Sequence, residues 1–222
     1  MSDPDVFAPV RNSVTMGSLV VLATVLVGTA AAYTITKGML RKSRVLFDAL
    51  LSLPFSVPGT VVAIYLILAY NTPVLMTGGE VLLGTFWILP LAYFIRTYPM
   101  VLRAVSSSLE KLDESLLEAA ETLGAGAFLR MRKVVLPMTF PGIVGGSLLV
   151  MIAALGEFVS SILLYTPANR PLSIEILSQL RGYNLGSAAA YGVVLLVLVL
   201  SFTALSGRLM GRRDAERIGL SI

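Results

Sequence analysis

The sequence predicts an all-α membrane protein with about five transmembrane helices. Of its 222 residues, 56% are hydrophobic and only 14% are charged, whereas about a quarter of the residues in a soluble domain are charged. The mean hydropathy is +0.84. The apolar residues gather in five runs, each near the length of about 20 residues that a helix needs to cross a bilayer. We therefore expect a single transmembrane domain over residues 1–222.

Composition excludes several classes of function. The chain has no Cys and no His, which removes thiolate and imidazole metal ligands, so no metal site is expected. It has no Gly-x-x-x-x-Gly-Lys-Ser/Thr loop for a nucleotide phosphate, so we expect no ATP site and no cofactor on this chain. The net charge of +4 lies between the apolar runs rather than on a soluble face, which argues against nucleic acid as a partner.

The five predicted spans are separated by polar segments. They run from about Val14 to Ile35, Val45 to Tyr70, Leu82 to Leu102, Phe140 to Tyr165 and Ala188 to Leu205. Pro54 and Pro58 interrupt the second span, and Pro90 and Pro99 interrupt the third. Proline removes a helical hydrogen bond and bends the helix. These bends are either ordinary kinks in a bundle or part of a gated path.

The basic residues predict the orientation of the spans. Thirteen of the 17 basic residues follow the first span, follow the third span or lie in the tail: Lys37, Arg41, Lys42, Arg44, Arg103, Lys111, Arg130, Arg132, Lys133, Arg208, Arg212, Arg213 and Arg217. The positive-inside rule places these segments in the cytoplasm. We therefore expect a multi-pass protein of the inner (plasma) membrane, surrounded by lipid, with its N-terminus outside and its C-terminus in the cytoplasm. The first residues include Asp3 and Asp5 but no basic residue, so they do not resemble a signal peptide.

The segment from about 105 to 139 is too polar to span the membrane, and it predicts two short helices. Apolar residues recur at helical spacing from Ser108 to Leu123, with acidic residues on the other face. The sequence Gly124-Ala-Gly126 is expected to end this helix, with Gly124 at a positive φ. A second, basic helix is expected to start near Ala127. Such a protrusion either fits a groove on another protein or is an ordinary solvated loop.

One gapped pattern in this segment resembles a known family motif. Glu118-Ala119-Ala120 is followed, after three intervening residues, by Gly124, and after nine further intervening residues by Val134, a spacer residue and Leu136-Pro137. This resembles the EAA motif of type I ABC importer permeases, with Val134 at a position where the family has Ile. The resemblance covers essentially the whole chain.

The resemblance implies a fold and a set of partners. The fold would be the type I importer permease fold, with residues 105–139 forming a cytoplasmic coupling helix that sits in a cleft of an ABC ATPase dimer. Glu118, Ala119, Ala120 and Gly124 would form the contact core, and Leu136-Pro137 would set the angle of re-entry into the membrane. ATP and Mg²⁺ would then bind the ATPase, so this chain is not expected to be an enzyme. The other partners would be an extracytoplasmic substrate-binding protein and a second permease subunit, identical or paralogous.

Glu157 is the candidate residue of the translocation path. A carboxylate in an apolar span is a functional-site hypothesis by default, and Ser160 and Ser161 follow at i+3 and i+4, which places them on the same face of a helix. Arg96 lies within the third span. Glu157 therefore either meets the substrate or pairs with Arg96 as a structural contact.

Three shorter features complete the sequence interpretation. Residues 171–181 have the spacing of an amphipathic helix at the outer surface, which either helps to receive the binding protein or covers the helix ends. Gly142 and Gly146 have the spacing that lets helices pack closely, compatible with dimerisation. Leu155-Gly-Glu157-Phe158, Asn169-Arg-Pro171-Leu172 and Gly186-Ser-Ala-Ala-Ala190 look most like permeases of the ferric-iron group, which favours iron(III) over polyamine, thiamine, sulfate or molybdate.

Other interpretations stay open. Many iron-group permeases have two fused halves, and this sequence resembles one half, so it is either a short permease or part of a longer chain. A stand-alone secondary transporter would usually show an internal repeat, and we find none. A non-transporting half-permease that only assembles complexes would share the same docking segment.

Overall fold

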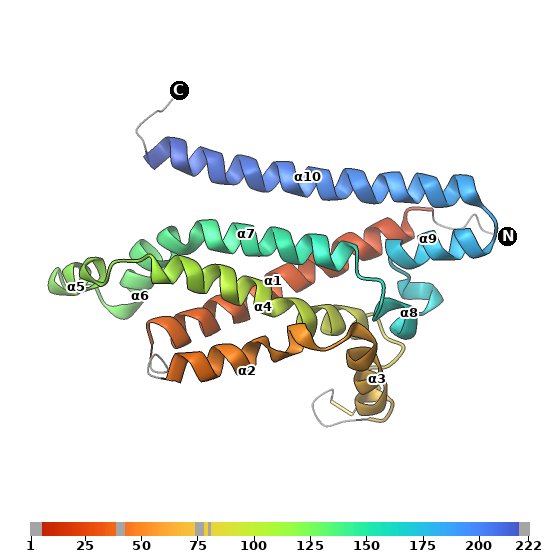
Figure 1. The fold of residues 1–222 in the computed structure, drawn as a ribbon, viewed down its shortest axis with the longest axis horizontal. Helices are drawn as coiled ribbons and strands as arrows, with labels where there is room; N and C mark the ends of the chain where they lie inside the picture. Colours follow the sequence, from red (N-terminus) through yellow and green to blue (C-terminus); the bar gives the residue numbers. More distant parts are fainter. Residues whose placement is uncertain (1–5, 39–42, 74–77, 80, 218–222) are drawn as a thin grey trace.

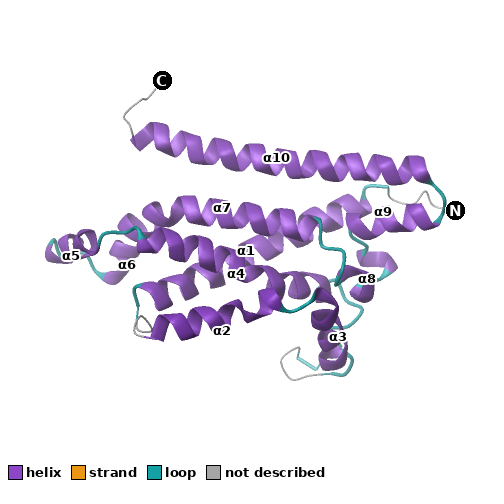
Figure 2. Ribbon diagram, in the orientation of Figure 1, coloured by secondary structure: helices purple, strands orange, loops and turns teal. Residues whose placement is uncertain are grey.

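The computed structural model describes residues 6–38, 43–73, 78–79 and 81–217. Within these residues the chain forms helices joined by turns and loops, without a strand (Figure 2). The helices are α1 (Ala8–Thr36), α2 (Arg44–Ser56), α3 (Gly59–Tyr70), α4 (Ile88–Glu110), α5 (Glu114–Thr122), α6 (Ala127–Arg130), the π-helix η3 (Met131–Val135), α7 (Leu136–Leu155), α8 (Ser161–Leu164), the 3₁₀-helix η4 (Pro167–Asn169), α9 (Leu172–Arg181) and α10 (Leu185–Arg217). The predicted all-α fold class is confirmed.

Three long helices, α1, α4 and α7, pack on one another and form the centre of the bundle. α2 lies beside α4, and α10 runs along the outside of the bundle (Figure 1). The short helices gather at the two ends. α5 and α6 protrude at one end, whereas α3, α8 and α9 lie at the other (Figure 1).

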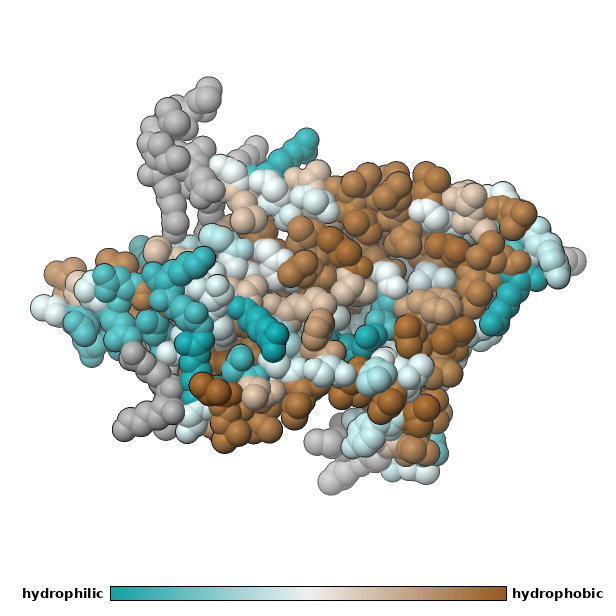
Figure 3. All heavy atoms as spheres, viewed as in Figure 1, coloured by the Kyte–Doolittle hydropathy of each residue, from teal (hydrophilic) through white to brown (hydrophobic). Residues whose placement is uncertain are grey.

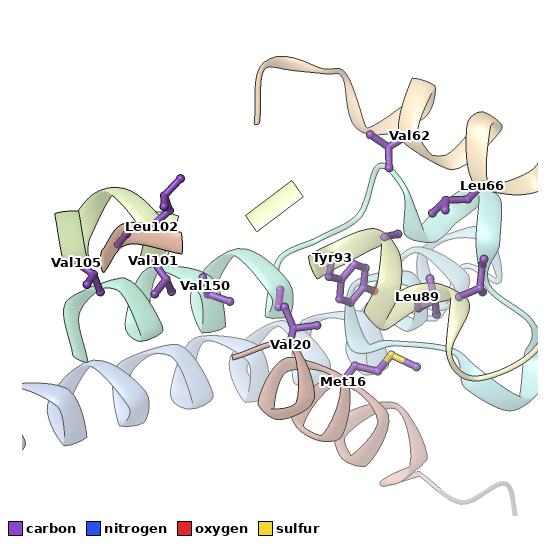
Figure 4. Close-up of a cluster of buried hydrophobic side chains, with 14 of the residues drawn as sticks. Met16, Val20, Val62, Leu66, Leu89, Tyr93, Val101, Leu102, Val105 and Val150 are labelled. Atoms are coloured by element: carbon purple, nitrogen blue, oxygen red, sulfur yellow. The ribbon is translucent and has the colours of Figure 1, made fainter. Parts of the chain in front are cut away.

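The core is built from apolar side chains of the central helices. The buried side chains include Met16 and Val20 of α1, Val101, Leu102 and Val105 of α4, and Val150 of α7 (Figure 4). Glycines allow the helices to approach closely. A Cβ on Gly142 would lie 2.5 Å from the backbone oxygen of Ala104, and a Cβ on Gly146 would lie 3.0 Å from Cα of Val101. The spacing of Gly142 and Gly146 therefore serves α4–α7 packing within this chain.

The second predicted span is two helices rather than one kinked helix. α2 and α3 meet at an angle of 91°. The break follows from Pro58, because a residue before proline is driven out of the helical region, and Val57 is extended with ψ 129°. α2 has 13 residues and covers about 20 Å, which is less than the bilayer core of about 30 Å. The 45–70 segment crosses the membrane only if both parts contribute.

The third and fourth predicted spans also have different limits in the structure. α4 begins at Ile88 and continues to Glu110, so it includes residues that the sequence assigned to the cytoplasmic segment. The basic helix that begins at Ala127 is not separate, because α6, η3 and α7 form one apolar helix to Leu155. That helix ends at Gly156, well before Tyr165. The predicted continuous 140–165 span is therefore broken.

Among the described residues, four helices are long and apolar enough to cross a membrane, and the bent α2–α3 pair raises this number to as many as five. α10 buries little of its apolar surface within this chain, since only 6% of its most apolar stretch of 18 residues is buried. Hydrophilic side chains gather at the α5 end of the molecule, whereas hydrophobic side chains cover much of the face toward the α9 end (Figure 3). This distribution fits a bundle whose sides face lipid.

Candidate functional site

The first part of the candidate site is α5, whose start is fixed by Asp113. Oδ1 of Asp113 accepts a hydrogen bond from the backbone N–H of Ser115 at 3.0 Å. This is the usual geometry of a helix N-cap, in which a carboxylate satisfies a backbone donor that has no partner inside the helix. The hydrogen bonds from the backbone and side chain of Ser115, opposed weakly by desolvation and helped by nearby Lys37, hold the pKa of Asp113 below its usual value.

The end of α5 is fixed by Gly124. Its φ is +80°, as expected from the sequence, and a Cβ at this position would meet nothing within 4 Å. The backbone N–H of Gly124 donates to the oxygen of Glu121 at 2.8 Å, and that of Ala125 donates to the oxygen of Ala120 at 2.9 Å. These two bonds form a Schellman turn. Gly124 is thus required by the backbone conformation and not by lack of space.

The predicted contact residues lie on the surface of this helix. Glu118 and Ala119 are exposed and Ala120 is half-buried. Two large apolar side chains of the same protrusion, Leu123 at the end of α5 and Phe128 of α6, are 87% and 78% exposed. The sequence placed Leu123 on the apolar face of its helix and gave no role to Phe128. Sequence spacing alone could not identify them, because an apolar residue at helical spacing is more often buried. Large apolar side chains left exposed on an otherwise polar segment are candidates for contact with another protein.

A polar contact holds the two sides of the protrusion together. Glu121 of α5 and Arg130 of α6 form an ion pair across the Gly124 turn. None of the nine residues of α5 is fully buried. The protrusion is therefore held by its caps and by polar contacts more than by a core of its own.

Val134, Leu136 and Pro137 lie where the chain returns to the bundle. Val134 is half-buried within η3, and Leu136 is 39% exposed at the start of α7. The backbone N–H of Leu136 donates to the oxygen of Met131, five residues earlier. This widened turn immediately precedes Pro137, which cannot donate the next helical hydrogen bond and would clash with the carbonyl four residues before it. The Leu136-Pro137 pair therefore coincides with a change of helix geometry and not with a loop.

The second part of the candidate site is at the opposite end of the bundle, where Arg96 of α4 and Glu157 form an ion pair. Their side chains are 24% and 12% exposed. Gly59, the first residue of α3, lies against this pair, since a Cβ there would be 2.8 Å from a terminal nitrogen of Arg96. The ion pair thus connects α4 with the break between α7 and α8, where Glu157 lies. It also lies against Gly59, at the break between α2 and α3.

Glu157 is not on a helix, contrary to the sequence prediction. Gly156 ends α7, and Glu157 lies in the irregular segment before α8. The two serines are nevertheless its neighbours. Oε1 of Glu157 accepts hydrogen bonds from the backbone N–H of Ser160 at 3.0 Å and from its hydroxyl at 2.9 Å, while the hydroxyl of Ser161 donates to the Glu157 carbonyl at 2.7 Å. These bonds lie at the start of the short helix α8, whose first residue is Ser161.

Ser160 and Ser161 themselves are fully buried in this conformation. The hydroxyl of Ser161 also lies 2.6 Å from that of Tyr93 on α4. Neither serine faces an open path within this chain, so the structure places them in the packing around Glu157.

The end of the bundle that holds Glu157 also contains the expected helix at 171–181, observed as α9 (Figure 1). Leu172 and Ile174 are buried residues of this helix, and its Glu175 pairs with Arg170 at 2.7 Å. The Asn12 side chain of α1 donates to the Arg170 carbonyl at 3.1 Å. A cavity of about 620 Å³ lies beside α9, lined by residues of α1, α9 and α10. These contacts show α9 covering the ends of the long helices.

Comparison with known proteins identifies the family. Residues 14–213 match the family described as binding-protein-dependent transport system inner membrane component. The chain belongs to this family. Its apolar helices and its family membership make it a multi-pass protein of the inner membrane.

Individual relatives agree with this assignment. The chain is 32% identical over 200 residues to the probable ABC transporter permease protein y4fN of Sinorhizobium fredii, covering 89% of this chain and 34% of the relative. It is 36% identical over 121 residues to the spermidine/putrescine permease protein PotB of Haemophilus influenzae, covering 53% and 42%. It is 26% identical over 216 residues to the molybdate/tungstate permease protein WtpB of Thermococcus kodakarensis, covering 97% and 83%. The chain thus spans about a third of y4fN and most of WtpB.

Solved structures share the fold. A chain of a bacterial alginate ABC transporter in complex with a pentasaccharide-bound periplasmic protein superposes with a TM-score of 0.77 at 19% identity, covering 96% of this chain and 80% of that one. A chain of the MetNI methionine ABC transporter in an inward-facing conformation gives a TM-score of 0.69 at 19% identity, covering 94% and 97%. The predicted importer permease fold is confirmed.

Proposed function

We propose that this chain is the membrane-spanning subunit of an ATP-driven ABC importer and that α5 docks it on a separate ATPase dimer. The observation that carries the proposal is the exposed, doubly capped α5 helix, which presents the EAA motif residues beside the apolar side chains of Leu123 and Phe128. A short rigid helix with an exposed apolar edge has the form of an element that fits a groove. ATP and Mg²⁺ would act on the ATPase, and this chain would convert their use into movement of its helices.

The orientation follows from the same element. If α5 meets a cytoplasmic ATPase, then the end of α10 nearest α5 is also cytoplasmic, and the start of α1 lies outside (Figure 1). This agrees with the distribution of basic residues. The outer end, with α3, α8 and α9, would receive an extracytoplasmic binding protein, and a second permease subunit, identical or paralogous, would complete the path.

Glu157 and Arg96 are our proposed residues of the path, with Ser160 and Ser161 supporting Glu157. They lie at the outer end, where two spans are interrupted. Because Arg96 neutralises Glu157, the pair does not by itself select a cationic or an anionic substrate.

The substrate stays a prediction: the sequence favours iron(III), whereas the named relatives do not. The named relatives above concern spermidine/putrescine and molybdate/tungstate, so polyamine and oxyanion substrates are equal rivals, and thiamine and sulfate remain on the list. In the described part of the chain, no group of three or more acidic side chains is arranged to hold a metal ion.

The docking proposal is tested by mild detergent purification of the tagged chain from its own cells, followed by mass spectrometry of the proteins that accompany it. We expect a phosphate-loop ATPase with the wild type and its loss with Gly124→Asp. The matched control is Gly186→Asp at the outer end, where a Cβ likewise meets nothing within 4 Å. Recovery of the ATPase with both variants would mean that α5 is not the docking element.

Two rival functions give different results. A stand-alone secondary transporter would be purified without an ATPase in every mild detergent. A non-transporting half-permease would bind the ATPase but show no ATP-dependent uptake in membrane vesicles given radiolabelled iron(III), putrescine, molybdate or sulfate. Uptake of one of these probes would identify the substrate class.

A further inference from the structure

The coupling of α5 to the rest of the bundle is the feature that the proposed function leaves unexplained. α5 contributes no fully buried residue, so a force applied to it would not pass through a packed core of its own. Its C-terminal side continues through α6 and η3 into α7. Its N-terminal side joins α4 through the short segment Lys111–Asp113, in which Leu112 is buried.

Lys37, the residue that caps the end of α1, contacts this second joint. Its ammonium donates to the carbonyl oxygen of Leu112 at 3.2 Å and to Oε1 of Glu114, the first residue of α5, at 3.3 Å. The Lys37 side chain is only 10% exposed, whereas that of Glu114 is 46% exposed. A lysine so well covered, bonded to both the joint and the helix, is held in one position. It is also placed at a helix C-terminus, where a cation is favoured.

A second ion pair stands beside the first but does not reach α5. Arg44, the first residue of α2, pairs with Glu110, the last residue of α4. The Arg44 side chain is more exposed than that of Lys37, at 37%, whereas Glu110 is 46% exposed, as Glu114 is. The two pairs and Thr36 line a hollow of about 360 Å³ between the ends of α1, α2, α4 and α5. The Arg44 pair therefore provides a nearby comparison in which the same kind of contact joins α2 to α4 only.

We propose that Lys37 is a positioning residue of energy coupling, which connects the α5 docking helix to α1 so that movement of α5 displaces α1 together with α4 and α7. This rests on the proposed function, since it assumes that an ATPase moves α5. α4 and α7 follow α5 through the continuous chain. α1 packs on both of these helices but does not adjoin α5 in the chain, and Lys37 joins its end directly to the joint and to α5, across 75 residues to Leu112 and 77 residues to Glu114.

The test measures movement and ATP use in the same complex, and it does not require the substrate. The chain has no Cys, so a single nitroxide spin label can be attached at Leu26→Cys on α1 or at Leu149→Cys on α7, positions that are 64% and 53% exposed. The purified permease–ATPase complex in lipid nanodiscs is compared with and without ATP plus vanadate. Each label is read in the wild type, in Lys37→Met and in Arg44→Met.

In the wild type we expect nucleotide to change the spectra of both labels. In Lys37→Met the change at the α1 label should be smaller than in the wild type, because the direct contact between α1 and α5 is lost, while the α7 label responds and ATP hydrolysis continues. Arg44→Met should behave as the wild type, and Lys37→Arg should restore part of the α1 response. A purely structural role would weaken both labels and ATP hydrolysis together.

The proposal is overturned if the α1 label responds in Lys37→Met as it does in the wild type, or if Arg44→Met loses the response equally. If Lys37→Met does not assemble, Glu114→Ala decides the matter, because that side chain is half exposed and its loss leaves no buried gap. An unchanged α1 response in Glu114→Ala would then contradict the proposal. Failure of the proposed function is distinct, since the wild-type chain would then bind no ATPase and neither label would respond.

Discussion

Arg96 and Glu157 stand 61 positions apart in the sequence, yet they form an ion pair at the point where two interrupted spans meet α4. Breaking such a pair leaves one poorly solvated charge without its partner. Glu157→Gln removes the charge but keeps an oxygen that can accept the Ser160 bonds. We expect it to lower the free energy of unfolding by about 2 kcal/mol, since the pair is partly exposed, as measured by titration with SDS.

The double variant Arg96→Met/Glu157→Gln should recover much of this loss, because it leaves no unpaired charge. Arg103→Met on the same helix is the control, since its side chain bonds a serine rather than a carboxylate. Additive losses in the double variant would show that the two side chains are not energetically coupled. We also expect Glu157→Gln to reduce uptake while the ATPase still co-purifies.

A conservative change at the α5 turn separates backbone conformation from side-chain bulk. Gly124→Ala forces a Cβ into the left-handed region, which costs about 1–2 kcal/mol, although nothing crowds the site. We expect the affinity of this variant for the ATPase, measured by titration of the purified chain with the ATPase, to be about tenfold lower. Gly126→Ala is matched, because Gly126 has φ −63° and open space around it, and it should bind as the wild type does. Equal binding by both variants would show that the turn geometry is not needed.

The start of α5 gives a prediction about pH. The pKa of Asp113 is lowered in the folded chain. The stability that its carboxylate contributes is therefore fully present above the pKa of the unfolded chain, and it is lost only as the pH falls through the still lower pKa of the folded chain. ATPase recovery should therefore not depend on Asp113 ionisation between about pH 5 and 8. Asp113→Asn, which can still cap, should retain binding across this range, whereas Asp113→Ala should weaken it throughout. A loss of binding near pH 6 that Asp113→Asn abolishes would contradict this assignment.

Close packing of α7 on α4 predicts opposite effects for two neighbouring glycines. Gly142→Ala would place a methyl group 2.5 Å from the backbone of Ala104, and overpacking of this kind costs about 1–3 kcal/mol. At Gly145 a Cβ meets nothing within 4 Å, so Gly145→Ala should be neutral or stabilise the helix by up to about 1 kcal/mol. Unfolding of both variants in SDS provides the comparison, and equal stabilities would contradict the packing seen here.

The sequence was most informative where structure depends on local chemistry. The Gly124 turn and the exposed EAA residues could be predicted because a glycine beyond a helix and an acidic helical face have local causes. The break at Glu157 could not, because Gly156–Ser160 lies within an apolar run and hydropathy does not register a helix end. The 91° bend at Pro58 was predicted as a kink, but its size depends on how α3 packs against α4 and α8.

Long-range polar contacts were also beyond prediction in most cases. Pairing of Arg96 with Glu157 was one of two interpretations, since both were rare charges within spans. Lys37 and Glu114 gave no such signal, because each lies among other charged residues and only the fold brings them together. Leu123 was placed on the apolar face of its helix, but it is 87% exposed, because α5 lies at the end of the bundle and buries none of its residues.

The absence of buried residues in α5 has a practical consequence for protein engineering. A segment that is bounded by its own N-cap and its own glycine turn, and that shares few contacts with the bundle, can be exchanged without repacking the transmembrane core. Replacing residues 114–123 with the corresponding segment of another permease, while retaining Asp113, Gly124 and the acidic first position, should yield a folded chain whose choice of motor protein is altered. Chimeric importers could thus be assembled from interchangeable membrane and motor modules.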